Sequence, residues 1–148
     1  MPLPRIVFFL TLVTALGACA APEPAPPSGK ARFPAYPQML FDAFRASCEG
    51  PARDFATPAR NVVECRELMP PEITASVILG YDGTTEDLPR LVIRFRADRD
   101  AASYLVTNDV YLNVPQKRGG PRRIPIEDRR LARELQRLYA QAGGVPAP

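Results

Sequence analysis

The sequence predicts an α+β domain of two layers, with an N-terminal helix, about four mainly antiparallel strands, and a C-terminal helix packed on one sheet face. Three observations favour this class. Apolar residues recur at helical spacing over 38–48, alternate with polar ones in short runs between 62 and 114, and recur at helical spacing again over 127–142. A chain of 148 residues has room for one such domain.

The two helices are predicted from the period of their apolar residues. Over 38–48, Leu40, Phe44 and Cys48 recur every four residues. Over 127–142, one face collects Leu131, Leu135, Leu138 and Ala142. Both stripes predict helices that bury one side against a sheet.

The clearest strands are 62–66 and 91–96, where apolar and polar residues alternate. In the second, Leu91, Ile93 and Phe95 are expected to face the core, and Arg94 and Arg96 to face outward. Two further segments leave alternatives open. Residues 72–81 favour a strand but could begin a helix at Pro71, and 104–114 fits either a hairpin turning at Asn108-Asp109 or one long strand.

The N-terminal segment has the pattern of a signal peptide over 1–18. A short basic start is followed by an apolar run over 6–16. A helix over that run would be about 16 Å long, too short for a hydrocarbon core of about 30 Å. One possibility is an ordinary leader that is cut after Ala18 or Ala20, which would release a soluble periplasmic protein.

Leu16-Gly17-Ala18-Cys19 resembles the lipobox of bacterial lipoproteins. The resemblance implies that the Cys19 sulfur carries a diacylglycerol, that the leader is cut just before it, and that the new amino terminus is usually acylated. The membrane is then a partner through the N-terminal lipid. By the sorting pattern of enteric lipoproteins, Ala20 in place of Asp suggests the outer membrane, with the domain facing the periplasm.

This anchor sets the expected organisation of the chain. Residues 19–37 are the lipidated cysteine and a proline-rich tether, 38–144 form a single domain, and 145–148 are a tail. Extended backbone over the tether would reach up to roughly 55 Å. A proline-rich ligand for a partner is the alternative interpretation of 19–37.

Cysteine counting links the anchor to the fold. With Cys19 assigned to lipid, Cys48 and Cys65 are the two that remain, and both lie on predicted buried faces. A leader implies an oxidising compartment, so a Cys48–Cys65 disulfide is expected. A redox pair is the functional alternative, but the spacing differs from Cys-x-x-Cys.

Composition excludes several kinds of chemistry. The chain has no histidine, which rules out a Ser-His-Asp triad, a Cys-His dyad and His-ligated metals. We therefore expect no enzyme activity, no metal and no cofactor. The one enzymatic alternative uses the carboxylates Asp82, Glu86 and Asp87. A net charge of +3 is too small to indicate a nucleic-acid partner.

Arginines supply the candidate binding residues: Arg94, Arg96, Arg122 and Arg123 could contact an anionic lipid or an acidic envelope protein. The alternative is that they are solvated surface. The expected function is a membrane-anchored, non-catalytic accessory or interaction module, and the second hypothesis is a domain that binds a small ligand or lipid.

Overall fold

The computed structural model describes residues 29–148, so the predicted leader 1–18 and Cys19 lie outside the described residues. In chain order the elements are β1 (Lys30–Phe33), α1 (Gln38–Ser47), β2 (Arg53–Ala59), β3 (Val62–Leu68), α2 (Pro71–Gly80), β4 (Arg90–Asp100), β5 (Ser103–Val114), β6 (Arg122–Pro125), α3 (Arg129–Gln141) and β7 (Val145–Pro146).

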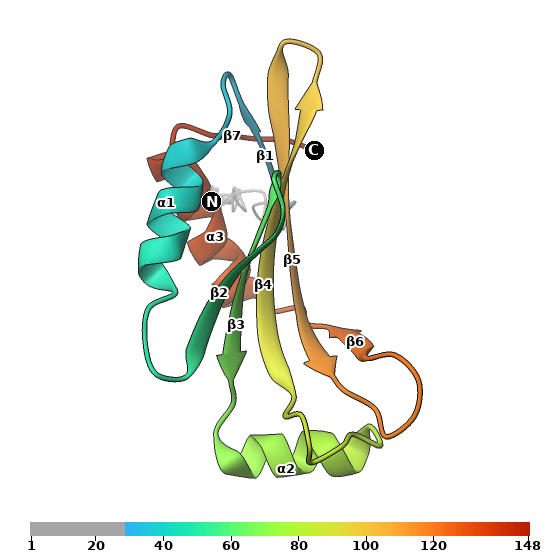
Figure 1. Ribbon diagram of the computed structural model, residues 1–148. Coiled ribbons are helices and arrows are strands. Elements are labelled where there is room, and N and C mark those ends of the chain that lie inside the picture. The colour runs from blue at the N-terminus through green and yellow to red at the C-terminus, as the bar shows by residue number, and fades with distance from the viewer. Residues whose placement is uncertain (1–28) are drawn as a thin grey trace, which may run out of the picture.

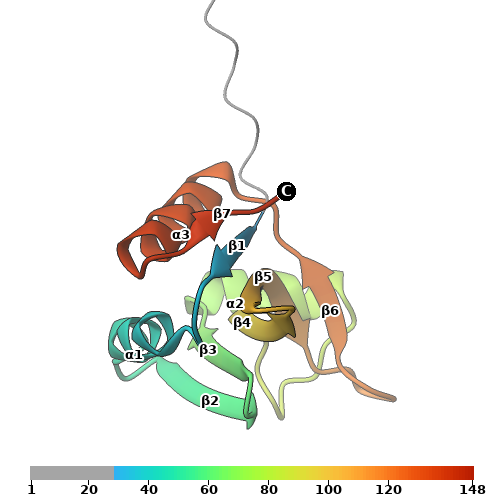
Figure 2. The same ribbon diagram turned by 90° about the horizontal axis from the view of Figure 1, so that it is seen from above.

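The strands form one sheet in the order β2-β3-β4-β5-β1-β7, and β6 also pairs with β5 (Figure 1). Every pairing is antiparallel. Strand β5 is long enough to hold β1 along its first half and β6 along its second. Helices α1 and α3 lie on one face of the sheet, whereas α2 lies across the end where β3 finishes (Figures 1 and 2).

The predicted fold class is wrong. The sheet has seven strands rather than about four, the first described element is a strand rather than a helix, and a third helix is present. The strands that the sequence did not predict are β1, β2, β6 and β7. They are short or rich in charge and proline, so pairing with longer neighbours defines them rather than their own apolar pattern.

Residues 72–81 form a helix, α2, instead of the favoured strand. Pro71 occupies its first turn, where proline is preorganised for a helix and needs no N–H partner. The helix buries Thr74 and Val77, three residues apart, and leaves Ile73 and Leu79 51% and 85% exposed. The apolar alternation was therefore misleading, because it does not mark a buried sheet face here.

The segment 104–114 is one long strand, the second of its two predicted alternatives. Asn108 and Asp109 do not turn, because they pair with Phe95 and Arg94 of β4. The hairpin turn lies earlier, at Ala101, whose φ of 53° is left-handed. Strand β4 extends over Arg90–Asp100 and keeps the predicted faces of its central residues.

Strands β1 and β7 lie outside the predicted domain limits of 38–144. Lys30–Phe33 belongs to the predicted tether and Val145–Pro146 to the predicted tail, yet the two pair with each other in the sheet. Ala31 and Phe33 of β1 are buried. The folded part therefore begins at least eight residues before position 38.

Aromatic rings form the centre of the core between the sheet and helices α1 and α3. Phe95 of β4 makes edge-to-face contacts with Phe44 of α1 at 4.7 Å and Tyr139 of α3 at 5.5 Å between ring centroids. Tyr139 also contacts Phe33 of β1. These contacts fix both helices over the same sheet face, with further buried apolar side chains around them.

The predicted disulfide between Cys48 and Cys65 is confirmed. It joins the residue after α1 to the middle of β3, and both cysteines are buried in the core. The bond closes a loop of 17 residues, which restricts the unfolded chain and stabilises the fold by about 3 kcal/mol on the loop-entropy estimate.

Replacing both cysteines, Cys48→Ala with Cys65→Ala, is expected to lower the free energy of unfolding by about 3 kcal/mol and the melting temperature by about 10–15 °C. Thermal unfolding followed by circular dichroism measures this. Wild-type protein treated with reductant is the control and should show a similar loss. An unchanged melting temperature in both samples would contradict a stabilising disulfide.

Candidate functional site

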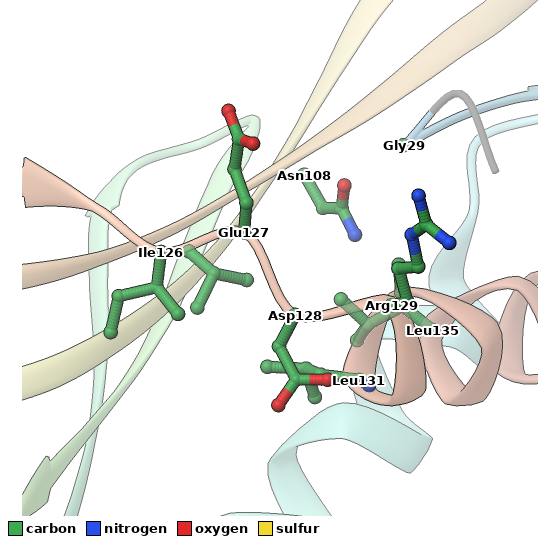
Figure 3. Close-up of a pocket in the computed structure, with 10 residues that line it drawn as sticks. Gly29, Asn108, Ile126, Glu127, Asp128, Arg129, Leu131 and Leu135 are labelled. Atoms are coloured by element: carbon green, nitrogen blue, oxygen red, sulfur yellow. Dashed lines mark hydrogen bonds between the residues drawn. The ribbon is translucent and has the colours of Figure 1, made fainter. Parts of the chain in front are cut away.

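The structure contains two candidate sites, one on each face of the sheet. The first is a groove of about 470 Å³ between the start of α3 and strand β5, on the face that α1 and α3 cover (Figure 3). Its apolar lining includes Val110, Leu131 and Leu135. Asn108 of β5 points into it, so the groove is lined by both apolar and polar side chains.

One polar group at this groove, the Asp128 carboxylate, has a structural role. Asp128 precedes α3 and accepts hydrogen bonds from the backbone N–H groups of Arg130 and Leu131, at 2.7 and 3.1 Å. These bonds lower the pKa of the Asp128 carboxyl. Asp128 therefore caps the helix through its Oδ1 atom.

The second candidate site is on the opposite sheet face, which no helix of the described chain covers and which we call the open face (Figure 2). The strand register arranges its side chains in rows that run across the strands. One row holds Asp54, Arg66, Val92, Tyr111 and Pro125, and the adjacent rows hold Glu64 with Arg94 and Arg90 with Asn113 and Arg123. These rows line a depression of about 370 Å³, here called the arginine depression.

Glu64 is the central charge of the open face, with a side chain only 3% exposed. Arg66 donates from Nε and Nη2 to Glu64 Oε2 at 2.9 and 2.7 Å. Arg94 donates from Nε to Glu64 Oε1 at 2.6 Å, and its Nη2 forms a second contact with the same oxygen. Both carboxylate oxygens are therefore occupied, which satisfies a buried charge that would otherwise be costly.

The electrostatics of Glu64 follow from these contacts. Burial raises the pKa of the Glu64 carboxyl, but the hydrogen bonds and charges of Arg66 and Arg94 outweigh it, so the pKa lies below its ordinary value. Burial lowers the pKa of Arg94, and the Glu64 carboxylate reverses that effect and raises it. Both groups are therefore charged at neutral pH, and they act as a fixed ion pair.

Tyr111 lies beneath two of the arginines. The guanidinium carbons of Arg94 and Arg123 lie 5.6 and 5.0 Å from the centroid of its ring. Burial raises the pKa of the Tyr111 hydroxyl, and the Glu64 charge adds to this. The ring thus provides an apolar base that orients two guanidinium groups on the open face.

The structure brings together only two of the four arginines that the sequence singled out. Arg94 and Arg123 both line the arginine depression. Arg96 lies on the open face but outside the depression, opposite Val62 and Thr107. Arg122 lies away from it, over the ring of Tyr81 at 5.4 Å.

Sequence reasoning missed several residues of the site: Glu64, Arg66, Arg90, Tyr111 and Asn113. The alternation of Val62–Leu68 did place Glu64 and Arg66 on the polar side of their strand. What it lacked was the register with β4, which puts Glu64 opposite Arg94. Arg90 had no signal beyond its position at the start of a strand.

The three carboxylates of the enzymatic alternative lie on the surface of the domain. Asp82, Glu86 and Asp87 are all exposed. Asp82 pairs with Lys117 at 3.2 Å on the surface. An exposed carboxylate lacks the shielding from solvent that acid–base catalysis uses. Within 29–148, no cluster of acidic or cysteine side chains could hold a metal ion, and no helix is long and apolar enough to span a membrane.

Comparison with known proteins adds no family assignment. No protein-family model matches the chain, and no curated protein is significantly similar to it.

The Glu64 ion pairs predict a pH-dependent stability. Because the folded-state pKa of Glu64 is lowered, its stabilisation is present above the unfolded pKa of about 4.3 and is lost as pH falls through the folded value. Glu64→Gln should reduce the free energy of unfolding by about 2 kcal/mol at neutral pH, a figure discounted because Arg66 is partly exposed. Urea unfolding from pH 7 to pH 3 measures the difference, which should shrink below about pH 4.

Glu67→Gln is the matched control for this experiment. Glu67 lies on the same strand and pairs with Arg53 at 3.2 Å, but both side chains are 40% exposed. Removing this surface pair should cost less than about 0.5 kcal/mol at any of these pH values. Equal losses for the two variants would contradict the central role of Glu64.

Proposed function

We propose that the chain is a lipid-anchored protein of the bacterial cell envelope and acts as a non-catalytic interaction module. The open face is the observation that carries this proposal. A sheet face with a fixed pattern of charges and no helix of residues 29–148 over it offers a partner a preformed polar surface. The exposure of Asp82, Glu86 and Asp87 favours a non-catalytic role.

The proposed anchor limits where this surface can act. Lipidation at Cys19 would leave residues 20–29 between the membrane and β1, and extended backbone over that segment spans about 31 Å. This reach is shorter than the roughly 55 Å predicted for a tether that ends at position 37. The module would therefore search for partners close to the membrane surface, which we propose is the periplasmic side of the outer membrane.

Anchoring is tested by Cys19→Ser. We expect the wild-type chain to be in the membrane fraction with an acylated N-terminal cysteine, because two or more acyl chains give stable anchoring. The variant should lose both properties, as measured by fractionation and by mass spectrometry of the N-terminal peptide. The Cys48→Ala, Cys65→Ala variant is the control and should stay in the membrane. A Cys19→Ser protein that stays there at the wild-type level would contradict the anchor.

Interaction through the open face is tested by photo-crosslinking in intact cells. A photoreactive residue at Arg96, exposed on the open face, should give a discrete adduct, because a docked partner would cover it. The same residue at Met39, exposed on α1, is the control and should give none. Identical adducts from both positions, or none from Arg96, would contradict a role for the open face.

A domain that binds a small ligand or lipid is the second candidate function. The groove between α3 and β5 favours it, since Val110, Leu131 and Leu135 give it an apolar lining. Native mass spectrometry of gently extracted protein distinguishes the two candidates. A discrete bound mass that a Leu131→Arg substitution removes would favour this second function, whereas protein without added mass would favour the interaction module.

A further inference from the structure

One row of the open face contains two arginines with an amide between them. Arg90 of β4 lies opposite Asn113 of β5, and Asn113 lies opposite Arg123 of β6. Neighbouring strands are about 4.8 Å apart, so the backbones at the two arginines are separated by about 10 Å. Side chains of this length can converge above the amide. The row therefore presents hydrogen-bond donors from three adjacent strands.

These two arginines form no hydrogen bond to a carboxylate of residues 29–148. Arg90 has only a long ion pair with Asp54, at 4.0 Å. Arg123 has no ion pair with any residue that the structure describes, and its guanidinium rests on the Tyr111 ring. By contrast, Arg66 and Arg94 are bound to Glu64. The four arginines of the depression thus divide into an occupied pair, hydrogen-bonded to Glu64, and a free pair, by which we mean arginines that hydrogen-bond to no carboxylate of residues 29–148.

The charges that line the depression indicate what charge a ligand bound there would carry. The depression is lined by four arginines and by three carboxylates, which are Asp54, Glu64 and Asp87. The difference, 4 − 3, leaves one positive charge. One negative charge on a ligand would balance it, whereas a second would be repelled by Asp54 and Asp87.

We propose that the arginine depression binds a carboxylate side chain of an acidic segment on a partner protein, which supplies the single negative charge. Arg90 and Arg123 donate hydrogen bonds to it, and the Asn113 amide donates between them. Glu64 holds Arg66 and Arg94 as a fixed wall of the site. This inference rests on the proposed function, because it names the chemical group that the open face recognises on a partner.

The test uses the full chain in non-ionic detergent and follows arginine Nε–Hε signals by NMR. Sodium acetate and dimethyl phosphate are the probes, at constant ionic strength. Saturable shifts are expected at Arg90 and Arg123. Arg123→Gln should weaken binding about tenfold, since it removes a charged hydrogen bond. Arg122→Gln is the matched control: it removes the same charge from the adjacent residue, which faces Tyr81, and should change binding less than twofold.

The probes also distinguish this carboxylate from the phosphate of a lipid headgroup. Saturation by acetate is expected for an acidic protein segment, whereas saturation by dimethyl phosphate alone would overturn the proposal and indicate a lipid headgroup. Shifts that grow linearly with both probes, or equal weakening by Arg122→Gln and Arg123→Gln, would overturn the proposal. Arg90→Gln provides a second variant should Arg123→Gln fail to fold.

Failure of the anion site and failure of the proposed function give different results. If the Arg96 photo-crosslink persists in cells that carry Arg123→Gln, and the purified wild-type chain binds neither probe, the anion site is wrong and the interaction module stands. If the purified chain binds acetate but no crosslink forms from Arg96, the anion site stands and the interaction module is wrong.

Discussion

The pairing of β4 with β5 is the constraint on which the rest of the structure depends. Each residue from Arg90 to Asp100 has a partner in β5. Because side chains alternate, this register sends Phe95 and Val106 to the helices and Arg94 to the open face. A slip of one residue would exchange the two faces. Strands β3, β1 and β6 all pair with this hairpin, so the aromatic core and the arginine depression both depend on its register.

Glu64 fixes the positions of two arginines on the open face. A buried carboxylate requires strong donors, and Arg66 and Arg94 supply them from adjacent positions of the sheet. This arrangement stabilises the fold and also removes two arginines from competition for a ligand. Arg90 and Arg123 keep their donors available. The same ion pairs therefore connect stability at neutral pH with the proposed chemistry of the site.

Local patterns in the sequence predicted the elements that carry long apolar periods. The stripes of α1 and α3 and the alternation of β3 and β4 are such elements, and the Cys48–Cys65 bond followed from counting cysteines. Short strands such as β1 could not be predicted, because Ala31 and Phe33 are its only buried residues and prolines follow. Helix α2 was mistaken for a strand because its apolar residues alternate although only one side of it is buried. The residues of the site could be grouped only from the register between strands, which the sequence of a single strand does not contain. Nothing near Arg123 in the sequence indicates that it shares a row of the sheet with Asn113 and Arg90.

Hydrogen exchange of the arginine Hε protons tests most directly the division between occupied and free arginines. NMR on the full chain in detergent can follow each proton at neutral pH. The structure predicts slow exchange at Arg66 and Arg94, whose Nε groups donate to Glu64, and fast exchange at Arg90 and Arg123. In Glu64→Gln, the slow pair should speed up while the fast pair is unchanged. One common exchange rate for all four in the wild-type chain would contradict the account.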